Sequence, residues 1–229
     1  MSLKFGTSGL RGLVTDLVGE ASYRYALAFL RVMNERGAPR TVVIGRDLRA
    51  SSPEIAGLAA AAARDEGFSI LDAGALPTPA LALEAGRLGF PAIMVTGSHI
   101  PEDRNGLKFY TPGGEITKSD ESDILEAFDA IGEVAPDRLS APADRPQSDA
   151  LARYLQRSVD AFGRDALTGM RIGIYQHSSV ARDVLVDAVE ALGGTALPFG
   201  RASSFIPVDT EAHRPEDLAV LRDAAKDGY

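Results

Sequence analysis

Apolar residues recur along the chain in two patterns, helical spacing over longer stretches and short continuous runs. Residues 22–36 repeat apolar side chains such as Leu27 and Leu30 at intervals of three or four, which is typical of the buried face of a helix. Short apolar runs, such as residues 41–44 and 91–95, indicate buried strands. The alternation of the two patterns along the chain predicts repeated β-α-β units.

The pattern as a whole predicts an α/β protein. We expect helices over residues 22–36, 52–64, 119–131, 149–163, 180–192 and 215–226, with one more helix that ends near residue 89. The expected strands cover residues 41–44, 69–72, 91–95, 171–175 and 195–197, and residues 107–116 indicate a β-hairpin. Helices that separate strands in this way favour two tandem three-layer α/β/α units with largely parallel mixed sheets.

A proline-containing stretch divides the two expected units. Residues 133–148 carry Pro136, Pro142 and Pro146 among alanine and charged residues, which is typical of a linker or a long surface crossing. We therefore expect a first domain over residues 1–140 and a second over residues 149–229. The last helix and its exit turn usually precede another strand, so we expect the second unit to be incomplete and the chain to be part of a longer protein.

Composition narrows the class of protein. With 45% hydrophobic residues the 229-residue chain can bury a core, and no apolar run approaches the ~20 residues that a membrane span needs. The absence of cysteine excludes disulfides and thiolate metal sites, so a cytoplasmic location is expected. A net charge of −8 argues against nucleic-acid or anionic-membrane partners. Composition does not decide the oligomeric state.

The candidate nucleophile is Ser98, which lies just after the strand expected over residues 91–95. Open α/β sheets place their chemistry at the carboxyl ends of strands. Gly97 allows a close turn around a bound group, and Pro101 stiffens the exit from the loop. His99 brings an imidazole beside the hydroxyl, so this loop is the expected centre of the site.

Two other stretches gather positive charge. Residues 6–12 combine three glycines, two hydroxyls and Arg11, which suits a phosphate but also fits a flexible terminus. Arg46, Asp47 and Arg49 follow the strand over residues 41–44, and a structural ion-pair cluster that holds the loop is favoured over direct catalysis.

Lys108 is a charge flanked by apolar residues within the expected hairpin. Alternation with a period of two places it on the face opposite Leu107 and Phe109. It is either a solvated lysine on an edge strand or part of the site that begins ten residues earlier.

Residues 6–12, 45–52, 96–101 and 105–108 together resemble, in order and spacing, the α-D-phosphohexomutases. The resemblance covers that family's first domain and most of its second, and implies that the second α/β unit is a cousin of the first. It implies an isomerase of carbohydrate metabolism, an intramolecular phosphotransferase that moves a phosphoryl group between C1 and C6 of a hexose phosphate. A phosphoserine at Ser98 and a bisphosphorylated sugar intermediate are implied with it.

The resemblance also assigns roles to residues. The catalytic residues implied are Ser98, His99, Lys108 and Arg11, and the substrate or phosphate contacts are Thr7, Ser8, Thr96, Gly97, Arg46 and Asn105. His99 is expected to hydrogen-bond the phosphoryl oxygens or the substrate, and Lys108 to act as a general base or a phosphate neutraliser. A buried lysine beside other cations has a lowered pKa, which suits the general base.

The implied cofactor is Mg2+, with hexose 1,6-bisphosphate as activator. Ser98 would ligate the metal through its phosphate, and the family's Asp-Gly-Asp-x-Asp loop and its sugar-selecting domains are absent from this chain. We therefore expect a hexose phosphate as substrate of the whole protein and negligible mutase turnover from residues 1–229 alone.

Several alternatives stay open. Many family members have asparagine where this chain has Ile100, so the loop must be held differently and the sugar is undecided: a phosphomannomutase-like enzyme, a phosphoglucosamine mutase or a phosphoglucomutase. A non-catalytic sugar-phosphate-binding module is the alternative outside enzymes. A serine hydrolase is disfavoured because adjacent residues in an extended loop point opposite ways and the Gly-x-Ser-x-Gly elbow is missing. His177 either faces the site or caps the following helix.

Overall fold

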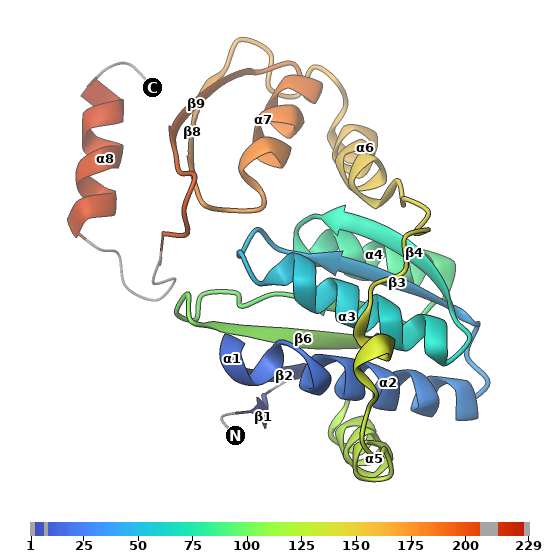
Figure 1. The fold of residues 1–229 in the computed structure, drawn as a ribbon. Coiled ribbons are helices and arrows are strands. Elements are labelled where there is room, and N and C mark those ends of the chain that lie inside the picture. The colour runs from blue at the N-terminus through green and yellow to red at the C-terminus, as the bar shows by residue number, and fades with distance from the viewer. Residues whose placement is uncertain (1–2, 7–8, 207–214, 227–229) are drawn as a thin grey trace. The chain divides into compact units, whose positions relative to one another are not determined.

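The computed structural model describes residues 3–6, 9–206 and 215–226 (Figure 1). The chain divides into two compact units, Met1–Ala150 and Leu151–Tyr229, which are described separately. No helix within the described ranges is long and apolar enough to cross a membrane. The cytoplasmic location expected from composition stays a prediction.

The first unit is built on one mixed sheet. Its strands are β1 (Lys4–Phe5), β2 (Gly9–Leu13), β3 (Thr41–Arg46), β4 (Ser69–Ala75), β5 (Ala92–Val95), β6 (Arg104–Thr111) and β7 (Gly114–Glu115). The order across the sheet is β1-β2-β6-β5-β3-β4, with β7 paired to β6. β3 pairs in parallel with β4 and β5, whereas β6 runs antiparallel to β2, β5 and β7. The parallel part of the sheet is therefore confined to its β4-β3-β5 side.

Helices cover both faces of this sheet. They are α1 (Val14–Leu17), α2 (Glu20–Glu35), α3 (Ser52–Asp65), α4 (Thr78–Leu88), α5 (Lys118–Asp129) and the 3-10 turn Pro136–Leu139. Ile44 packs into the core shared with α2 and α3, while a Cβ at the neighbouring Gly45 would meet Leu76 and Leu81 on the α4 side. Because successive residues of a strand face opposite ways, α4 lies on the face opposite α2 and α3 (Figure 1).

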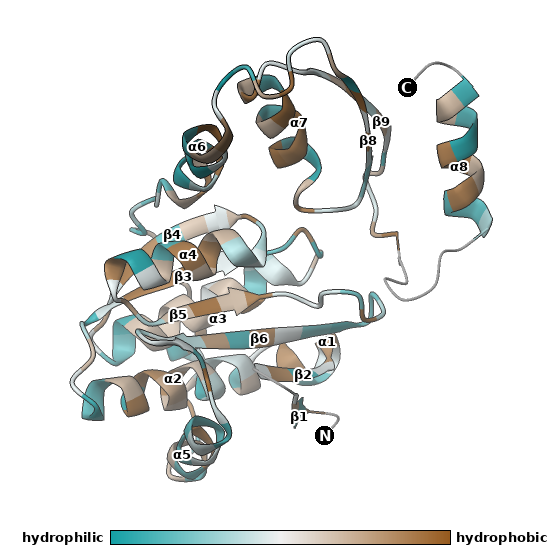
Figure 2. Cartoon of the chain, turned by 180° about the vertical axis from the view of Figure 1, so that it is seen from behind, coloured by the Kyte–Doolittle hydropathy of each residue, from teal (hydrophilic) through white to brown (hydrophobic). Residues whose placement is uncertain are grey.

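The core explains why these segments fold as they do. The strand β5 is buried at every position, and Figure 2 draws it as predominantly apolar, while α2 alternates between apolar and polar residues. Phe29 of α2 stacks on Phe109 of β6 with ring centroids 4.8 Å apart. The amphipathic helix thus buries one face against the sheet, as its spacing predicts.

Three local expectations need correction. The helix expected from residue 22 begins two residues earlier, at Glu20, and the buried Ser22 hydroxyl donates to the carbonyl of Leu17 at 2.6 Å. Residues 6–12, for which a flexible terminus was one interpretation, include part of a strand, because β2 pairs with β6 within the sheet. The strand β6 begins at Arg104, three residues before the expected start of the hairpin.

The stretch expected to be a linker or surface crossing lies along the first unit. Asp72 of β4 donates its N–H to the carbonyl of Pro146 at 2.8 Å and accepts from the N–H of Ser148 at 2.7 Å. Asp72 also forms a parallel bridge with Gln147. The crossing thus pairs with the edge strand β4.

The second unit contains α6 (Ala150–Phe162), β8 (Arg171–His177), α7 (Arg182–Ala191), β9 (Thr195–Arg201) and α8 (Pro215–Lys226). The two strands pair in parallel and α7 connects them, as in a β-α-β unit. His177 forms the end of β8, and its ring lies 5.4 Å from that of Tyr175. A role for His177 in the site stays a prediction.

Candidate active site

Two loops of the first unit meet where β3 and β5 end. Because these strands are parallel, with Arg46 opposite Val95, the segments that follow them leave from the same edge of the sheet. The first loop carries Asp47 and Arg49 into α3, and the second carries Ser98 and His99. The two motifs therefore share one rim of the sheet.

Ser98 is exposed and takes an unusual backbone conformation. Its φ is 50°, in the left-handed region, and its N–H donates to Thr96 Oγ1 at 2.9 Å. Its hydroxyl lies 3.3 Å from Nδ1 of the exposed His99. Adjacent side chains therefore do meet in this loop, contrary to the expectation for an extended segment, because the left-handed residue turns the chain.

That contact does not make a hydrolase triad. No carboxylate among the described residues pairs with His99, although a triad needs a third group that orients the imidazole. The chain presents a hydroxyl beside an imidazole at the surface, an arrangement suited to binding or exchanging an anionic group.

Asp47 connects the two loops. Its Oδ2 accepts the N–H of Gly97 at 3.0 Å, and its Oδ1 accepts the N–H of Arg49 at 3.0 Å and the hydroxyl of Ser52 at the start of α3. Arg49 is only 4% exposed and forms an ion pair with Asp47 at 3.5 Å. The interpretation of Asp47 and Arg49 as a structural cluster that holds the loop is supported by these contacts.

Ile100 shows how the loop is held where an asparagine is common in the family. Its carbonyl accepts from Arg49 at 2.6 Å, and its N–H donates to the carbonyl of Gly97 at 3.0 Å. The side chain is half-buried. The main chain therefore anchors this position, and no polar side chain is needed there.

Arg11 and Lys108 lie close to the Ser98 loop. Arg11 is opposite Gly106 on the neighbouring strand, and Thr96 donates its N–H to the carbonyl of Gly106 at 3.1 Å from the other side. With strands about 4.8 Å apart, Arg11 and Thr96 are separated by roughly 10 Å along the sheet. Lys108 lies two residues from Gly106 and so shares the face of Arg11.

Lys108 is not on an edge strand, because β6 lies between β2 and β5. Its ammonium group forms an ion pair with Glu115 at 2.9 Å and lies 5.7 Å from the centre of the Tyr110 ring. Burial opposes the charged form, but the hydrogen bond and charge of Glu115 outweigh it and raise the pKa of Lys108 above its ordinary value. The lowered pKa expected for a general base is therefore wrong for this structure.

Asn105 was expected to contact the substrate, and the structure corrects this. The residue is 0% exposed, and its amide donates to the hydroxyls of Ser51 and Ser52 at 2.9 Å each. Its carbonyl oxygen accepts the N–H of Gly106 at 2.8 Å. Asn105 therefore joins β6 to the start of α3, and no part of the residue is exposed at the surface.

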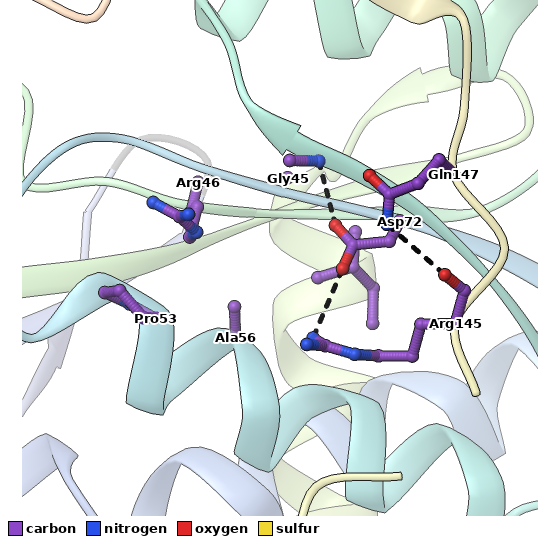
Figure 3. A pocket seen from close by; sticks show the side chains of 9 residues that line it. Gly45, Arg46, Pro53, Ala56, Asp72, Arg145 and Gln147 are labelled. Carbon is purple, nitrogen blue, oxygen red and sulfur yellow. Dashed lines mark hydrogen bonds and ion pairs between the residues drawn. The ribbon is translucent and has the colours of Figure 1, made fainter. Parts of the chain in front are cut away.

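Arg46 lies at a pocket of about 250 Å³ (Figure 3). Across this pocket, Arg145 pairs with Asp72 at 3.3 Å, and Asp72 also accepts the N–H of Gly74 at 2.8 Å. The half-buried Arg46 donates to the carbonyl of Asp47 at 3.3 Å. Its phosphate-binding role stays a prediction, while Thr7 and Ser8 lie outside the described residues.

The described residues do not by themselves form a magnesium site. Among them, no group of three or more histidine, cysteine, aspartate or glutamate side chains is placed to hold a metal ion. Mg2+ prefers several oxygen ligands, and the exposed hydroxyl of Ser98 offers one once phosphorylated.

Two contributing residues escaped the sequence analysis. Glu115, the partner of Lys108, lies in the returning strand of the hairpin, and the turn at residues 112–114 was the signal that could have placed it near Lys108. Ser51 binds Asn105 across 54 positions of sequence, a contact that no local pattern indicates.

Comparisons with known proteins agree on one family. Residues 2–135 match the family model described as phosphoglucomutase/phosphomannomutase, alpha/beta/alpha domain I. A phosphomannomutase of Sinorhizobium fredii is 48% identical over 240 aligned positions, covering 99% of this chain and 49% of the relative. A phosphomannomutase of Salmonella muenchen is 42% identical, covering 94% and 44%. A phosphoglucosamine mutase of Corynebacterium jeikeium is 33% identical, covering 86% and 43%.

Solved structures agree with the fold. A putative phosphomannomutase of Thermus thermophilus has a TM-score of 0.74 at 21% identity, covering 98% of this chain and 52% of that one. A phosphoglucomutase/phosphomannomutase family protein of Burkholderia thailandensis has a TM-score of 0.71 at 24% identity, covering 96% and 48%. At such identities the likeness shows the fold alone, and it confirms the α/β class.

The chain spans about half the length of the curated relatives that it matches. The match to the family model nevertheless extends over more than half of this chain. The chain belongs to the phosphoglucomutase/phosphomannomutase family.

Proposed function

We propose that this chain is the phosphoserine-bearing part of a phosphomannomutase-like phosphohexomutase. In the proposed reaction Ser98 exchanges a phosphoryl group with a hexose phosphate, through a hexose 1,6-bisphosphate that also serves as activator. The two relatives named phosphomannomutase share 48% and 42% identity with the chain, against 33% for the phosphoglucosamine mutase, which favours a mannose phosphate.

The presentation of Ser98 is the observation that carries the proposal. Its hydroxyl is exposed at the carboxyl end of a buried strand and lies 3.3 Å from the His99 imidazole. A serine oxygen leaves or attacks phosphorus readily only when nearby groups handle its proton and charge. The distance of the His99 ring from the Ser98 hydroxyl supports His99 as the group that handles the proton.

Two positively charged side chains on the sheet are suited to neutralising the negative charge of the phosphoryl group. Arg11 and Lys108 share one face of the sheet beside the strand that leads into the Ser98 loop. Glu115 keeps Lys108 charged, so the geometry favours Lys108 as a phosphate neutraliser over a general base. Arg11 offers the planar, bidentate donors that phosphate oxygens accept.

The transfer itself needs few groups from this chain. The bond from phosphorus to Ser98 Oγ breaks as a bond from phosphorus to a sugar hydroxyl oxygen forms. The sugar hydroxyl loses its proton, and Ser98 Oγ gains one, for which the His99 ring is within reach. When bound, Mg2+ would neutralise charge on the phosphoryl oxygens, with the phosphorylated Ser98 as the ligand that this chain supplies.

The direct test is transfer of phosphate to Ser98. We expect the chain, incubated with Mg2+ and either glucose or mannose 1,6-bisphosphate, to gain one phosphate that peptide mass spectrometry maps to Ser98. Ser98→Ala is expected to gain none, and His99→Ala to be loaded more slowly. Sugar-phosphate binding without any loading of Ser98 would favour the non-catalytic binding module instead.

A further inference from the structure

A buried arginine lies directly beneath the Ser98 loop. Arg49 is 4% exposed, and its guanidinium group donates to four carbonyl oxygens of this loop: those of Ser98 (3.1 Å), Ile100 (2.6 Å), Pro101 (2.7 Å) and Arg104 (3.1 Å). These four groups span seven residues of chain. One side chain therefore fixes most of the main-chain path around Ser98.

The loop packs closely against the Arg49 side chain at Gly97. A Cβ added at Gly97 would come within 2.2 Å of Nε and 2.3 Å of Cζ of Arg49, so glycine is required for the approach. From the same element, Asp47 accepts the N–H of Gly97 at 3.0 Å. Asp47 and Arg49, two residues apart, thus bind the entry and the body of the loop.

The chemistry of arginine matches this task and that of other residues does not. A buried guanidinium is destabilising unless its donors are satisfied, and burial indeed lowers the pKa of Arg49 against the opposing charge of Asp47. A planar fork with five N–H donors can reach four carbonyl oxygens at once, whereas a lysine offers only three donors from one atom. An apolar side chain could donate to none of those carbonyls.

The hydrogen bonds of the loop fix the backbone conformation of Ser98. Its carbonyl is turned inward to Arg49 and its N–H to Thr96 Oγ1, so the peptide groups on both sides are fixed. The left-handed conformation is strained for a residue other than glycine and persists only where its surroundings impose it. The inward hydrogen bonds impose it, and the hydroxyl is left facing outward, beside His99.

We propose that Arg49 is a positioning residue for phosphoryl transfer at Ser98. By holding four loop carbonyls inward it fixes the conformation in which the Ser98 hydroxyl is presented to the phosphoryl group. Arg49 touches neither the substrate nor the phosphoryl group. The proposal rests on the proposed function for its chemical consequence, but its structural consequence can be measured without any transfer.

The first measurement is hydrogen exchange of backbone amides in the whole chain. We compare Arg49→Ala and Arg49→Lys with Arg31→Ala, which removes a partly exposed arginine from an ion pair with Glu66, at the end of α3 opposite the loop. Faster exchange confined to residues 97–104 in both Arg49 variants supports the proposal. Unchanged exchange there, or equal acceleration across the first unit, overturns it.

The second measurement is the rate of phosphate loading onto Ser98 from hexose 1,6-bisphosphate. Misplacing a reacting group by about 1 Å can cost around a hundredfold in rate, so we expect at least a tenfold loss in Arg49→Ala and no loss in Arg31→Ala. Added methylguanidine should restore part of the rate of Arg49→Ala, while methylammonium at the same concentration should not. A global defect would give no such selectivity, and loading of Arg49→Ala at the normal rate would exclude the positioning role.

The two measurements separate the two proposals. If the unaltered chain takes up no phosphate at Ser98, the proposed function fails, and hydrogen exchange still decides whether Arg49 holds the loop. If the unaltered chain is loaded and Arg49→Ala is loaded equally well, the proposed function stands and the role of Arg49 is rejected.

Discussion

Two clusters of charged side chains in the first unit have similar members and opposite surroundings. Beneath the Ser98 loop, the side chains of Arg49 and Asp47 are 3% and 13% exposed, and their partners are mostly main-chain groups. Between α2 and α5, Arg36 pairs with Asp120 and Asp123; the side chains of Arg36 and Asp123 are 36% and 47% exposed, and that of Asp120 is 12% exposed. The comparison indicates that the buried cluster defines the conformation of a loop, whereas the exposed one joins two helices that hydrophobic contacts already hold.

The largest expected effect comes from removing one charge of the buried cluster. Asp47→Asn leaves Arg49 without its counter-charge in a buried place, which typically costs about 3–5 kcal/mol of the free energy of unfolding. Asp123→Asn, the matched change in the exposed cluster, should cost about 1 kcal/mol or less. Urea unfolding of both variants checks this. Equal losses would show that burial does not separate the two clusters.

The second largest loss of stability is expected from a substitution that crowds the buried cluster. Gly97→Ala places a methyl group 2.2 Å from Arg49 Nε, and such overpacking costs about 1–3 kcal/mol. Gly113→Ala is the control, since the nearest atom to its added Cβ is Thr111 Oγ1 at 3.6 Å. Thermal unfolding compares the two. A fully stable Gly97→Ala protein would mean that the loop can leave the guanidinium at little cost.

Features that depend on residues close together in the sequence were the ones that the sequence could predict. The fold class, the helices and the position of Ser98 after a buried strand follow from apolar spacing, which local sequence carries directly. The helix α8 occurs at residues 215–226 as expected. Ser98 and the Arg49 loop were brought to one rim because parallel strands end at one edge.

What escaped prediction depends on partners distant in sequence. The contacts of Asn105 with Ser51 and Ser52 cross more than 50 residues, so a buried amide could not be told from a substrate ligand. The pKa direction of Lys108 depends on Glu115, which a hairpin turn brings close. The antiparallel pairing of β2 with β6 likewise has no local signal.

Removing the N-terminal cap of α5 is expected to cause a smaller loss of stability. Thr117 begins α5 with a capping box, in which its hydroxyl accepts the N–H of Asp120 at 3.3 Å and Asp120 accepts the N–H of Thr117 at 2.6 Å. Thr117→Ala should lower the free energy of unfolding by about 1 kcal/mol. Ser119→Ala, two positions further along the chain and exposed, serves as control. Loss of stability equal to that of Asp47→Asn would contradict the ranking of the two regions.

The smallest effect is expected at the Lys108–Glu115 pair, whose members are 25% and 49% exposed. Glu115→Gln should move the pKa of Lys108 downward, because burial then acts without the opposing carboxylate. A raised pKa in the folded state stabilises the protein fully below the ordinary lysine pKa and loses that contribution as the pH rises through the raised value. The stability difference between the two proteins should therefore be at most about 1 kcal/mol near neutral pH and shrink in strong alkali.

Titration of 13C-labelled lysine by NMR measures the shift in the pKa of Lys108, with Lys118 as an exposed internal reference. A pKa of Lys108 that stays the same in Glu115→Gln would mean that Glu115 does not hold the charge. A pKa of Lys108 below the ordinary lysine value in the unaltered chain would return its general-base role to consideration.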